Sequence, residues 1–562
     1  MNRPTNAAHV TKSQETSRPD SAAVELIAIG EKLRLFHDGN EGTYAMKPSA
    51  LGSARPVLLS STSFRSWLAR EYHAQSQGKK AASGEALATA ISVLSAKALD
   101  GEQDEVHVRV ASAGRAIYLD LGDAFGDAVE IDSEGWRVTR PPVRFRLVRG
   151  MLPLPVPVDG GSVDELRDLV NVADDHSWRL LVAWLVAALR PGRPFPVLVL
   201  QGEHGSAKST TSRILRALID PAKPSLRRPP RDAGDFAIAA RNSWVLAYDN
   251  LSGLSGELSD LLCCVATGGG FSKRQLYTDG DEVTFDFMRP VTLNGIDELL
   301  SRPDLTDRAL RVALPVIPTE NRRSEKDVWA AFEISRPRIL GALCSAVSSA
   351  LASLAEVESR KEPWPRMMDF AQWAEAAGSG LGWSPGAFLA SYQGNRGDLV
   401  GESLAADPVA TALVAVLSRC PDWKGTAGSL LAELTRIAPV PRAKSWPENE
   451  RALTDRLRRL APQLRSTGIQ WLPPGRTDKR RIHSFQPTAQ TAHNLESEKE
   501  PLTAGANGSI GSSANDWRTK SDDDRESVGA EGGLGGHLQM HPRGCRCAGD
   551  DCALGGELRA GS

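Results

Sequence analysis

The stretch VLVLQGEHGSAKSTTSRIL at residues 197–215 joins an apolar run to a small polar turn and then to a helical pattern of apolar residues. A short continuous apolar run is typical of a strand buried in a parallel sheet. A helix that follows such a strand across a glycine-containing turn presents backbone N–H groups that bind phosphate. The stretch therefore predicts an α/β fold with a phosphate-binding loop (P-loop) at the end of a buried strand.

The turn follows the pattern GxxxxGK[S/T] at Gly202, Lys208 and Ser209. Ala207 replaces the second glycine, and alanine is compatible with the negative φ that we expect where a helix begins. Lys208 should contact the β- and γ-phosphates of ATP, and Ser209 should bind Mg²⁺. The expected nucleotide-binding residues are Gly202, Glu203, His204, Gly205, Ser206, Ala207, Lys208, Ser209 and, at the α-phosphate, Thr210.

A second apolar run, at residues 244–248, ends in Asp249. A P-loop ATPase needs a carboxylate there to hold Mg²⁺, although such an aspartate can instead cap the turn that follows it. Many ATPases next have a glutamate that activates the attacking water, whereas this chain has Asn250. Asparagine can orient a water but cannot take its proton, so the sequence predicts nucleotide binding and leaves the rate of hydrolysis open.

Two more buried strands are expected at residues 290–293 and 310–314. Strands that alternate with helices predict a three-layer α/β core. The first of these two strands is followed by Asn294, which we expect between the phosphate loop and Asp249 as a sensor of the γ-phosphate.

Three arginines follow in the segment SRPDLTDRALRVALP, namely Arg302, Arg308 and Arg311. One of them is a candidate arginine finger that reaches the nucleotide of a neighbouring subunit; we prefer Arg308, with Arg311 as the alternative. Local ion pairs with Asp304 and Asp307 are the other interpretation.

The composition of the whole chain limits its class. The 562 residues exceed what one hydrophobic core usually supports, and a formal net charge of −2 means that any nucleic-acid surface must be a local patch. Residues 1–22 have no apolar run behind a basic start, and the apolar run at residues 180–189 is about half the length that a bilayer requires. The seven cysteines do not form a disulfide framework. We therefore expect a cytoplasmic protein without a membrane span.

Periodicity and composition divide the chain into six predicted parts. They are a disordered arm (1–22), an N-terminal α+β module (23–157), an ATPase core (158–327), a helical segment (328–403), a domain of three helices and a strand pair (404–486) and a disordered tail (487–562). The tail contains a cluster of possible zinc ligands whose spacing matches no standard finger, so we expect accidental clustering. These residues are His537, His541, Cys545, Cys547 and Cys552.

The motifs GEHGSAKST, VLAYDN, TGGGFSKRQLY, TLNG and RPDLTDRAL follow one another in this order. The order resembles superfamily 3 helicase-like ATPases of phages, plasmids and DNA viruses, especially the ATPase half of mobile-element primase–helicases. The resemblance covers the chain from about Val24 to Phe485 and implies an AAA+-like core, a C-terminal winged helix and a ring of identical subunits. It also implies a DNA-contacting loop at Lys273 and Arg274. Residues 1–150 contain no recognisable primase carboxylates, so priming is not predicted.

Basic residues collect in the domain that the resemblance identifies as a winged helix. Its third helix and the segment PPGRTDKRRIH offer a surface for duplex DNA. A solvated helix face is the alternative, because neighbouring acidic residues partly neutralise the arginines. The candidate DNA-binding residues are Arg456 and Arg459 on the helix and Arg476, Lys479, Arg480 and Arg481 on the wing.

Taken together, these features predict a DNA-acting, helicase-like motor that binds and hydrolyses ATP with Mg²⁺ during phage or mobile-element replication. The alternative is a nucleotide-gated DNA-binding initiator or regulator with little turnover. Asn250 is the feature that favours this alternative.

Overall fold

The computed structural model describes most of the chain between Ser21 and Pro487. The described residues are 21–40, 42–49, 53–269, 271–274, 282–285, 288–295, 299–300, 302–438, 446–475 and 481–487. Residues 1–20 of the predicted arm, residues 488–562 of the predicted tail and the tail's five histidines and cysteines lie outside them. All described residues belong to one unit, Met1–Lys499.

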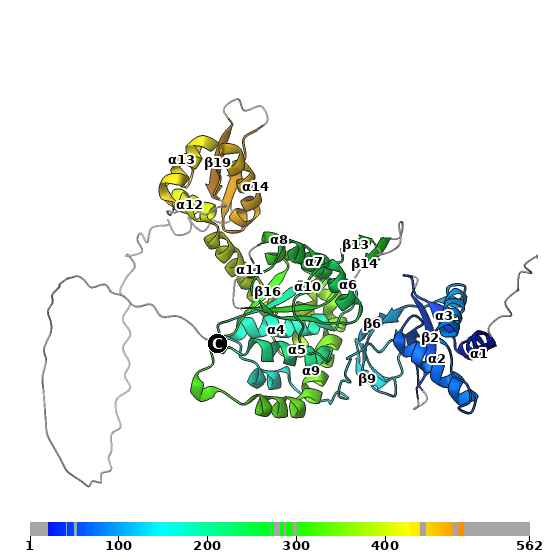
Figure 1. Cartoon of the computed structure of the whole chain (residues 1–562). Coiled ribbons are helices and arrows are strands. Elements are labelled where there is room, and N and C mark those ends of the chain that lie inside the picture. The colour runs from blue at the N-terminus through cyan, green and yellow to red at the C-terminus, as the bar shows by residue number, and fades with distance from the viewer. Residues whose placement is uncertain are drawn as a thin grey trace, which may run out of the picture. The chain divides into compact units, whose positions relative to one another are not determined.

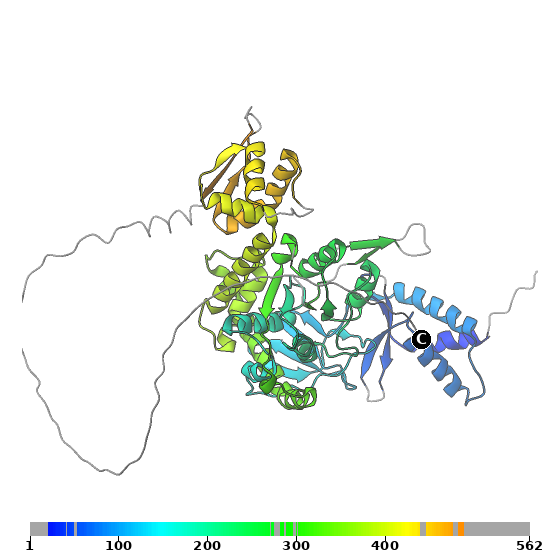
Figure 2. The same ribbon diagram turned by 60° about the vertical axis from the view of Figure 1, so that its left-hand side comes forward.

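The N-terminal part begins with three helices beside a small sheet (Figures 1 and 2). The helices are α1 (Ser21–Gly30), α2 (Thr62–Gln75) and α3 (Gly84–Leu99). The sheet has the order β3-β2-β1-β4, with β1 at Leu35–His37, β2 at Thr43–Pro48, β3 at Ala54–Leu58 and β4 at Glu102–Gln103. Ser61 and Ser83 start α2 and α3 because each side chain accepts a backbone N–H of the first turn. Apolar faces of all three helices form one buried cluster there.

A second, antiparallel sheet follows and shares its core with the rest of the chain. Its strands are β6 (Val110–Ala113), β7 (Ala116–Asp120), β8 (Ala128–Asp132) and β9 (Gly135–Thr139). The short strands β5 (Val106–His107) and β10 (Arg144–Phe145) pair in parallel beside it. Leu119 and Ile131 of this sheet belong to the same buried cluster as Trp184 and Leu343. The apolar core is therefore continuous across residue 157, where a linker was expected.

The central sheet is parallel, as the apolar runs predicted. Its order is β12-β15-β11-β16, with β11 at Val197–Gln201, β12 at Leu246–Leu251, β15 at Val291–Gly295 and β16 at Ala309–Ala313. Crossover helices connect the strands: α5 (Lys208–Ile219), α6 (Ala233–Arg241), α7 (Gly256–Thr267) and α8 (Pro303–Thr306). The predicted α/β class is confirmed by this sheet.

Side chains on β11 show that the sheet is covered on both faces. Leu198 and Leu200 pack into one cluster, whereas Val197 and Val199 pack into another. Successive strand residues point to opposite faces, so each cluster is one apolar layer. The first layer contains α4 (Asp175–Ala188) and α5, and the second contains α6 and α7 (Figure 1).

A helical region completes the large core. It contains α9 (Glu325–Ser359), α10 (Met368–Ala376), α11 (Ala387–Ala406) and the 3-10 helices η1 (Val163–Leu169), η2 (Thr319–Asn321) and η3 (Ser379–Leu381). Within the described part of the chain, α9 is long and apolar enough to cross a membrane, and so are α11 and α12 (Pro408–Leu417) when this bent pair is taken as one segment. Half of the apolar window of α9 is buried inside the protein. Phe332, Ile339 and Leu343 of α9 lie in the core, as expected of a core helix.

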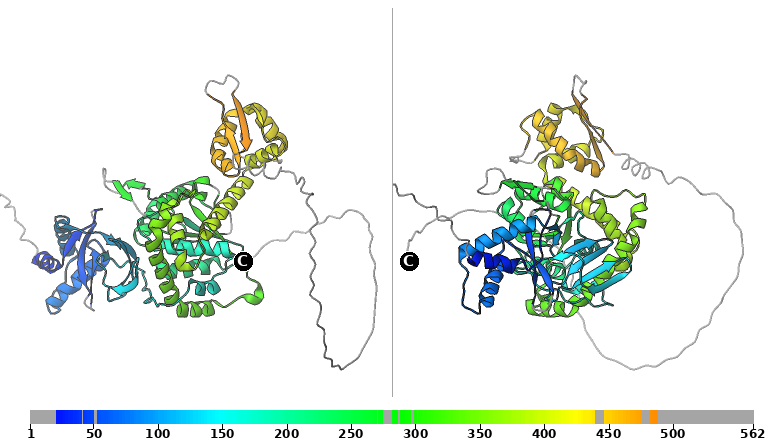
Figure 3. Two further views of the ribbon diagram at one scale, coloured as in Figure 1. Left: turned by 180° about the vertical axis from the view of Figure 1, so that it is seen from behind. Right: turned by 90° about the vertical axis from the view of Figure 1, so that its right-hand side faces the viewer.

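The C-terminal part contains three helices packed beside a small antiparallel sheet (Figure 3). The helices are α12 (Pro408–Leu417), α13 (Ala427–Ile437) and α14 (Glu450–Ser466). The sheet has the order β17-β19-β18, with β17 at Lys424–Thr426, β18 at Ile469–Leu472 and β19 at Ile482–Pro487. The three helices and the strand pair match the expected elements. The three-residue strand β17 is a third strand, at one edge of the sheet. Leu430, Leu457 and Phe485 lie in its buried core.

Candidate functional site

The residues predicted to bind nucleotide lie at the carboxyl edge of the central sheet. The loop at residues 202–207 follows β11, and α5 begins at Lys208. Strand β15 lies between β11 and β12 and pairs Leu200 with Asn294. Carboxyl ends of neighbouring parallel strands meet at one edge, which is where ligands bind in open α/β sheets.

The loop is closed around the ammonium group of Lys208. Its Nζ donates hydrogen bonds to the carbonyl oxygens of Gly202 and Glu203, each at 2.7 Å. Ser206 is almost fully buried, and its Oγ donates to the Glu203 carbonyl at 2.8 Å. Loss of hydration lowers the pKa of Lys208, while the charge of Asp249 opposes that shift. A cation is therefore held inside the loop with an aspartate in its field.

Hydrogen bonds hold three of the predicted residues in two adjoining groups, one at Asp249 and one at the next residue, Asn250. Ser209 Oγ donates to Asp249 Oδ1 at 2.9 Å. Asn294 is 1% exposed; its Oδ1 accepts the N–H of Asn250 at 2.9 Å, and its Nδ2 donates to Ser212 Oγ at 3.2 Å. The side chains expected to bind metal and to sense phosphate thus form one network with the first turns of α5.

Strand β12 is irregular at the point where this network meets it. The pairing of β12 with β15 shifts between Tyr248 and Leu251, and Asn250 in the shift has a φ of +58°. A bulge leaves a backbone N–H without its ladder partner, and such a group needs another acceptor. The Asn294 side chain supplies that acceptor. The Asn250 side chain itself is exposed.

Ala207 departs from the expected conformation. Its φ is +62°, in the left-handed region, and its side chain makes no capping hydrogen bond. The expectation of a negative φ was wrong because helical geometry begins one residue later, at Lys208. Alanine therefore occupies a turn position that glycine fits without strain.

The donor set at this edge suits Mg²⁺ bound together with phosphate. The hydroxyl of Ser209 and the carboxylate of Asp249 are hard oxygen ligands. Among the residues that the structure describes, no group of three or more histidines, cysteines, aspartates or glutamates could hold a metal by itself. Mg²⁺ commonly completes its shell with water and substrate phosphates, which is the arrangement these two residues would need. The outer loop residues Glu203 and His204 are exposed, and Thr210 is half-buried.

The candidate finger arginines contact other helices of the same chain. Arg308 donates to the Asp304 carbonyl at 2.7 Å, and its Nε is buried without a hydrogen-bond partner. Arg311 forms an ion pair with Glu402 on α11. Arg302 pairs with Asp260 at 2.8 Å. The structure does not place these side chains in the network of Ser209 and Asp249.

The predicted DNA-binding residues fall in different settings. Lys273 and Arg274 lie on β13 (Phe271–Arg274), which pairs with β14 (Glu282–Phe285). Arg456 forms an ion pair with Asp407, the N-cap of α12, whereas Arg459 is exposed. Arg481 is exposed too, while Arg476, Lys479 and Arg480 lie outside the described residues.

Two polar residues support the site although no motif predicted them. Asn171 Nδ2 donates to the Ser206 carbonyl at 3.3 Å and to the Pro315 carbonyl, so it fixes the loop from outside. Asp220 ends α5, and its buried carboxylate accepts the N–H groups of Trp244 and Val245 just before β12. Neither residue belongs to a local pattern, because each finds its partners far along the chain.

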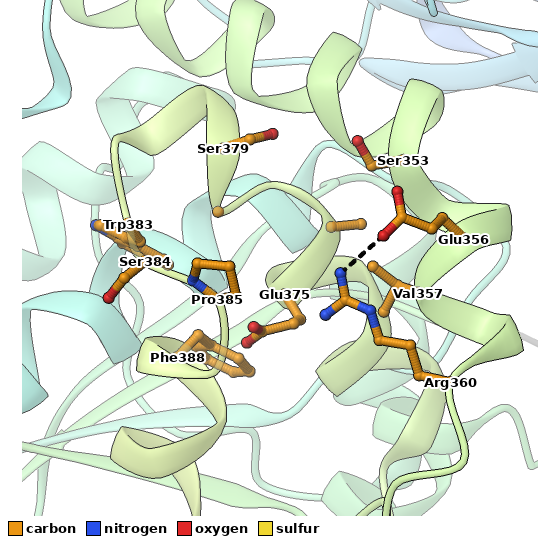
Figure 4. A pocket seen from close by; sticks show the side chains of 12 residues that line it. Ser353, Glu356, Val357, Arg360, Glu375, Ser379, Trp383, Ser384, Pro385 and Phe388 are labelled. Carbon is orange, nitrogen blue, oxygen red and sulfur yellow. Dashed lines mark hydrogen bonds and ion pairs between the residues drawn. The ribbon is translucent and has the colours of Figure 1, made fainter.

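A polar cavity in the helical region has a structural explanation. Its volume is about 180 Å³, and Figure 4 shows Glu375 and the Glu356–Arg360 ion pair among its lining residues. The Glu375 carboxylate accepts the N–H groups of Gly386 and Leu389 at the start of α11. The carboxylate is therefore used to cap a helix.

Comparisons with known proteins support a role in replication. Residues 163–400 match the family described as "Actinomycete integrative conjugative element replication protein", and residues 409–498 match the "AICE RepA C-terminal domain". A search of curated proteins gave no match.

Two solved structures are similar to this chain at low sequence identity. One titled "The A form apo structure of NrS-1 C terminal region-CTR" is 9% identical, with a TM-score of 0.38, and covers 84% of this chain and 99% of that one. "The apo structure of NrS-1 C terminal region (305-718)" is 11% identical, with a TM-score of 0.36, and covers 83% and 98%. The assignment rests on the family matches, which identify residues 163–400 and 409–498 as parts of a mobile-element replication protein.

Proposed function

We propose that this chain is a DNA-acting ATPase, a helicase-like motor that serves the replication of a mobile element. The family matches supply the setting of replication. The observation that carries the ATPase is the contact of Ser209 with Asp249 at the mouth of a loop that encloses Lys208. This combination of cation, hydroxyl and carboxylate is what a nucleoside triphosphate with Mg²⁺ requires.

Each residue of the network has a role in this proposal. Backbone N–H groups at the start of α5 and the ammonium of Lys208 bind the phosphates. Ser209 and Asp249 hold Mg²⁺, which stabilises the charge that develops on the phosphate oxygens. Asn294 senses the γ-phosphate, and its bonds to Asn250 and Ser212 connect that event to β12 and α5.

The finer architecture belongs to the same proposal. The parallel order β12-β15-β11-β16, with apolar layers on both faces, supports an AAA+-like P-loop core. Helices α12–α14 with the β17-β19-β18 sheet support a winged helix. In a ring of identical subunits, Arg308 is the preferred finger toward a neighbouring site. The β13–β14 hairpin with Lys273 and Arg274 would contact DNA.

One observation favours a second function, a nucleotide-gated DNA-binding initiator. Asn250 stands where a catalytic carboxylate is common, and its backbone N–H, not its side chain, is engaged in the network. Without a base to accept the proton of the attacking water, ATP would act mainly as a switch.

Turnover with and without DNA separates the two functions. ATP hydrolysis by the full chain would be measured alone, with single-stranded DNA and with duplex DNA. Strong stimulation by DNA supports the motor, and slow turnover indifferent to DNA supports the switch. Asp249→Asn, which keeps an oxygen acceptor for Ser209 but removes the charge, should abolish Mg²⁺-dependent turnover while some nucleotide binding persists. Unchanged turnover in that variant would contradict the metal assignment.

A further inference from the structure

The segment that leaves β16 runs along the outside of the phosphate loop. Leu314 N–H donates to the Gln201 carbonyl at 2.8 Å, and Ile317 N–H donates to the Gly205 carbonyl at 3.2 Å. Asn171 bridges the same two stretches through the carbonyls of Ser206 and Pro315. One contact to the end of β11, one to the loop and a bridge through Asn171 therefore hold this segment beside the loop before the chain turns into η2.

The segment brings one guanidinium group to the loop. Arg322 directly follows η2, and its Nε donates to the Ile317 carbonyl at 3.3 Å. A Cβ built on Gly205 would lie 3.3 Å from Arg322 Nη2. Gly205 has a φ of +81° and no side chain, so nothing of its own separates the guanidinium from the loop backbone. A second cation thus stands beside the loop that encloses Lys208.

Arg322 is not paired with any carboxylate among the residues that the structure describes. It is exposed. By contrast, Arg213 and Arg338 form ion pairs with Glu325 and Glu165. A guanidinium presents planar donors that match two phosphate oxygens at once. An unpaired one beside a phosphate loop is available to a phosphate ligand.

We propose that Arg322 binds the phosphates of the nucleotide from the same chain, as a second cation of the site built around Lys208. This inference rests on the proposed nucleotide site and adds a residue to it. It differs from the role proposed for Arg308, because Arg322 needs no neighbouring subunit. The monomer should therefore show the effect.

The test measures the affinity of the full chain for a fluorescent ATP analogue with Mg²⁺. Arg322→Ala should weaken binding about tenfold, since a hydrogen bond to a charged group is lost. Arg322→Lys keeps the charge and should retain part of the affinity, whereas Arg322→Gln keeps bulk and hydrogen bonding and should not. Arg323→Ala is the matched control, because Arg323 anchors the same segment through the Asp168 carbonyl at 3.2 Å.

Each outcome distinguishes the two levels of the proposal. Parent-like affinity in all three Arg322 variants, together with lost binding in Lys208→Ala, would overturn the role of Arg322 and leave the site intact. Parent-like affinity in Lys208→Ala would overturn the site and this inference with it. Equal losses in Arg323→Ala and Arg322→Ala, or in the Lys and Gln variants, would show that the arginine only supports the segment. Thermal unfolding of each variant identifies folding defects, and the Lys and Gln variants then decide the question.

Discussion

The predicted polar residues are arranged differently at the carboxyl edge of the central sheet and in the C-terminal domain. At the sheet edge, Ser209 contacts Asp249, and Asn294 contacts the neighbouring Asn250 and Ser212 of α5. In the C-terminal domain, the described candidates Arg456 and Arg459 lie on α14 and Arg481 directly precedes β19, and Arg456 is occupied by Asp407 of its own domain.

This difference helps to distinguish residues that are positioned to bind a ligand from residues that stabilise the fold. A lysine held by loop carbonyls, beside a bonded hydroxyl and carboxylate at the strand ends, matches the needs of a nucleotide bound with Mg²⁺. An arginine paired with a helix-capping carboxylate stabilises the protein whether or not DNA is present. Polar residues in the two regions are therefore expected to differ in whether they bind a ligand or stabilise the fold.

The largest effect is expected at the sheet edge. Lys208→Ala should weaken ATP binding about 100-fold and reduce turnover to background, because the phosphates lose the cation enclosed in the loop. Calorimetric titration of ATP measures the loss. Lys326→Ala, which removes an exposed lysine of α9, is the control and should bind as the parent does. Equal ATP affinities of Lys208→Ala and Lys326→Ala would contradict a nucleotide site at the sheet edge.

Arg308 and Arg311 provide the next test. Arg308→Ala should leave ATP binding intact and lower turnover by about 1000-fold if it acts across a subunit boundary. Mixing this variant with Lys208→Ala should restore some turnover, since mixed interfaces pair an intact loop with an intact finger. Arg311→Ala should instead lower the melting temperature, because it breaks the pair with Glu402. No recovery at any mixing ratio, with assembly verified, would exclude a shared site.

A smaller effect should divide two arginines of one helix. Arg456→Ala should destabilise the protein by about 2 kcal/mol, because the side chain of Asp407 is only 8% exposed and would keep its charge without its partner. Arg459→Ala should leave stability unchanged and lower the slope of duplex affinity against salt by about 1, as expected for one lost phosphate contact. Melting curves and DNA titrations at several salt concentrations measure both. An unchanged slope for Arg459→Ala would make this face a protein-docking surface.

The smallest effect concerns the strained turn. Ala207→Gly should stabilise the protein by about 1 kcal/mol, because glycine adopts the left-handed conformation without steric cost. Ala217→Gly, inside α5, is the matched control and should destabilise by about the same amount. Urea unfolding of both variants gives the comparison. A loss of stability in Ala207→Gly would mean that the alanine methyl group contributes more than the strain costs.

Local patterns were sufficient to predict the sheet and most of the site. Apolar runs marked the four parallel strands, and polar residues at the strand ends marked Asp249 and Asn294. The remaining features depend on partners far away in sequence. Asn171 contacts a loop 35 residues later, and Glu402 pairs with Arg311 from 91 residues away. The φ of Ala207 escaped prediction for a local reason, because the start of α5 had to be known to one residue.

The buried carboxylate of Asp220 limits where the chain can be cut into stable fragments. It lies at the end of the helix that begins with Lys208 and accepts two N–H groups that lead into the strand of Asp249. It also pairs at 3.1 Å with Arg109, which directly precedes β6 of the second N-terminal sheet. Both side chains of this pair are almost fully buried. A fragment that begins at residue 158 would leave a desolvated anion at the base of both site elements. The N-terminal module and the central sheet therefore depend on each other, and a chimaera that exchanges either part must keep Arg109 together with Asp220.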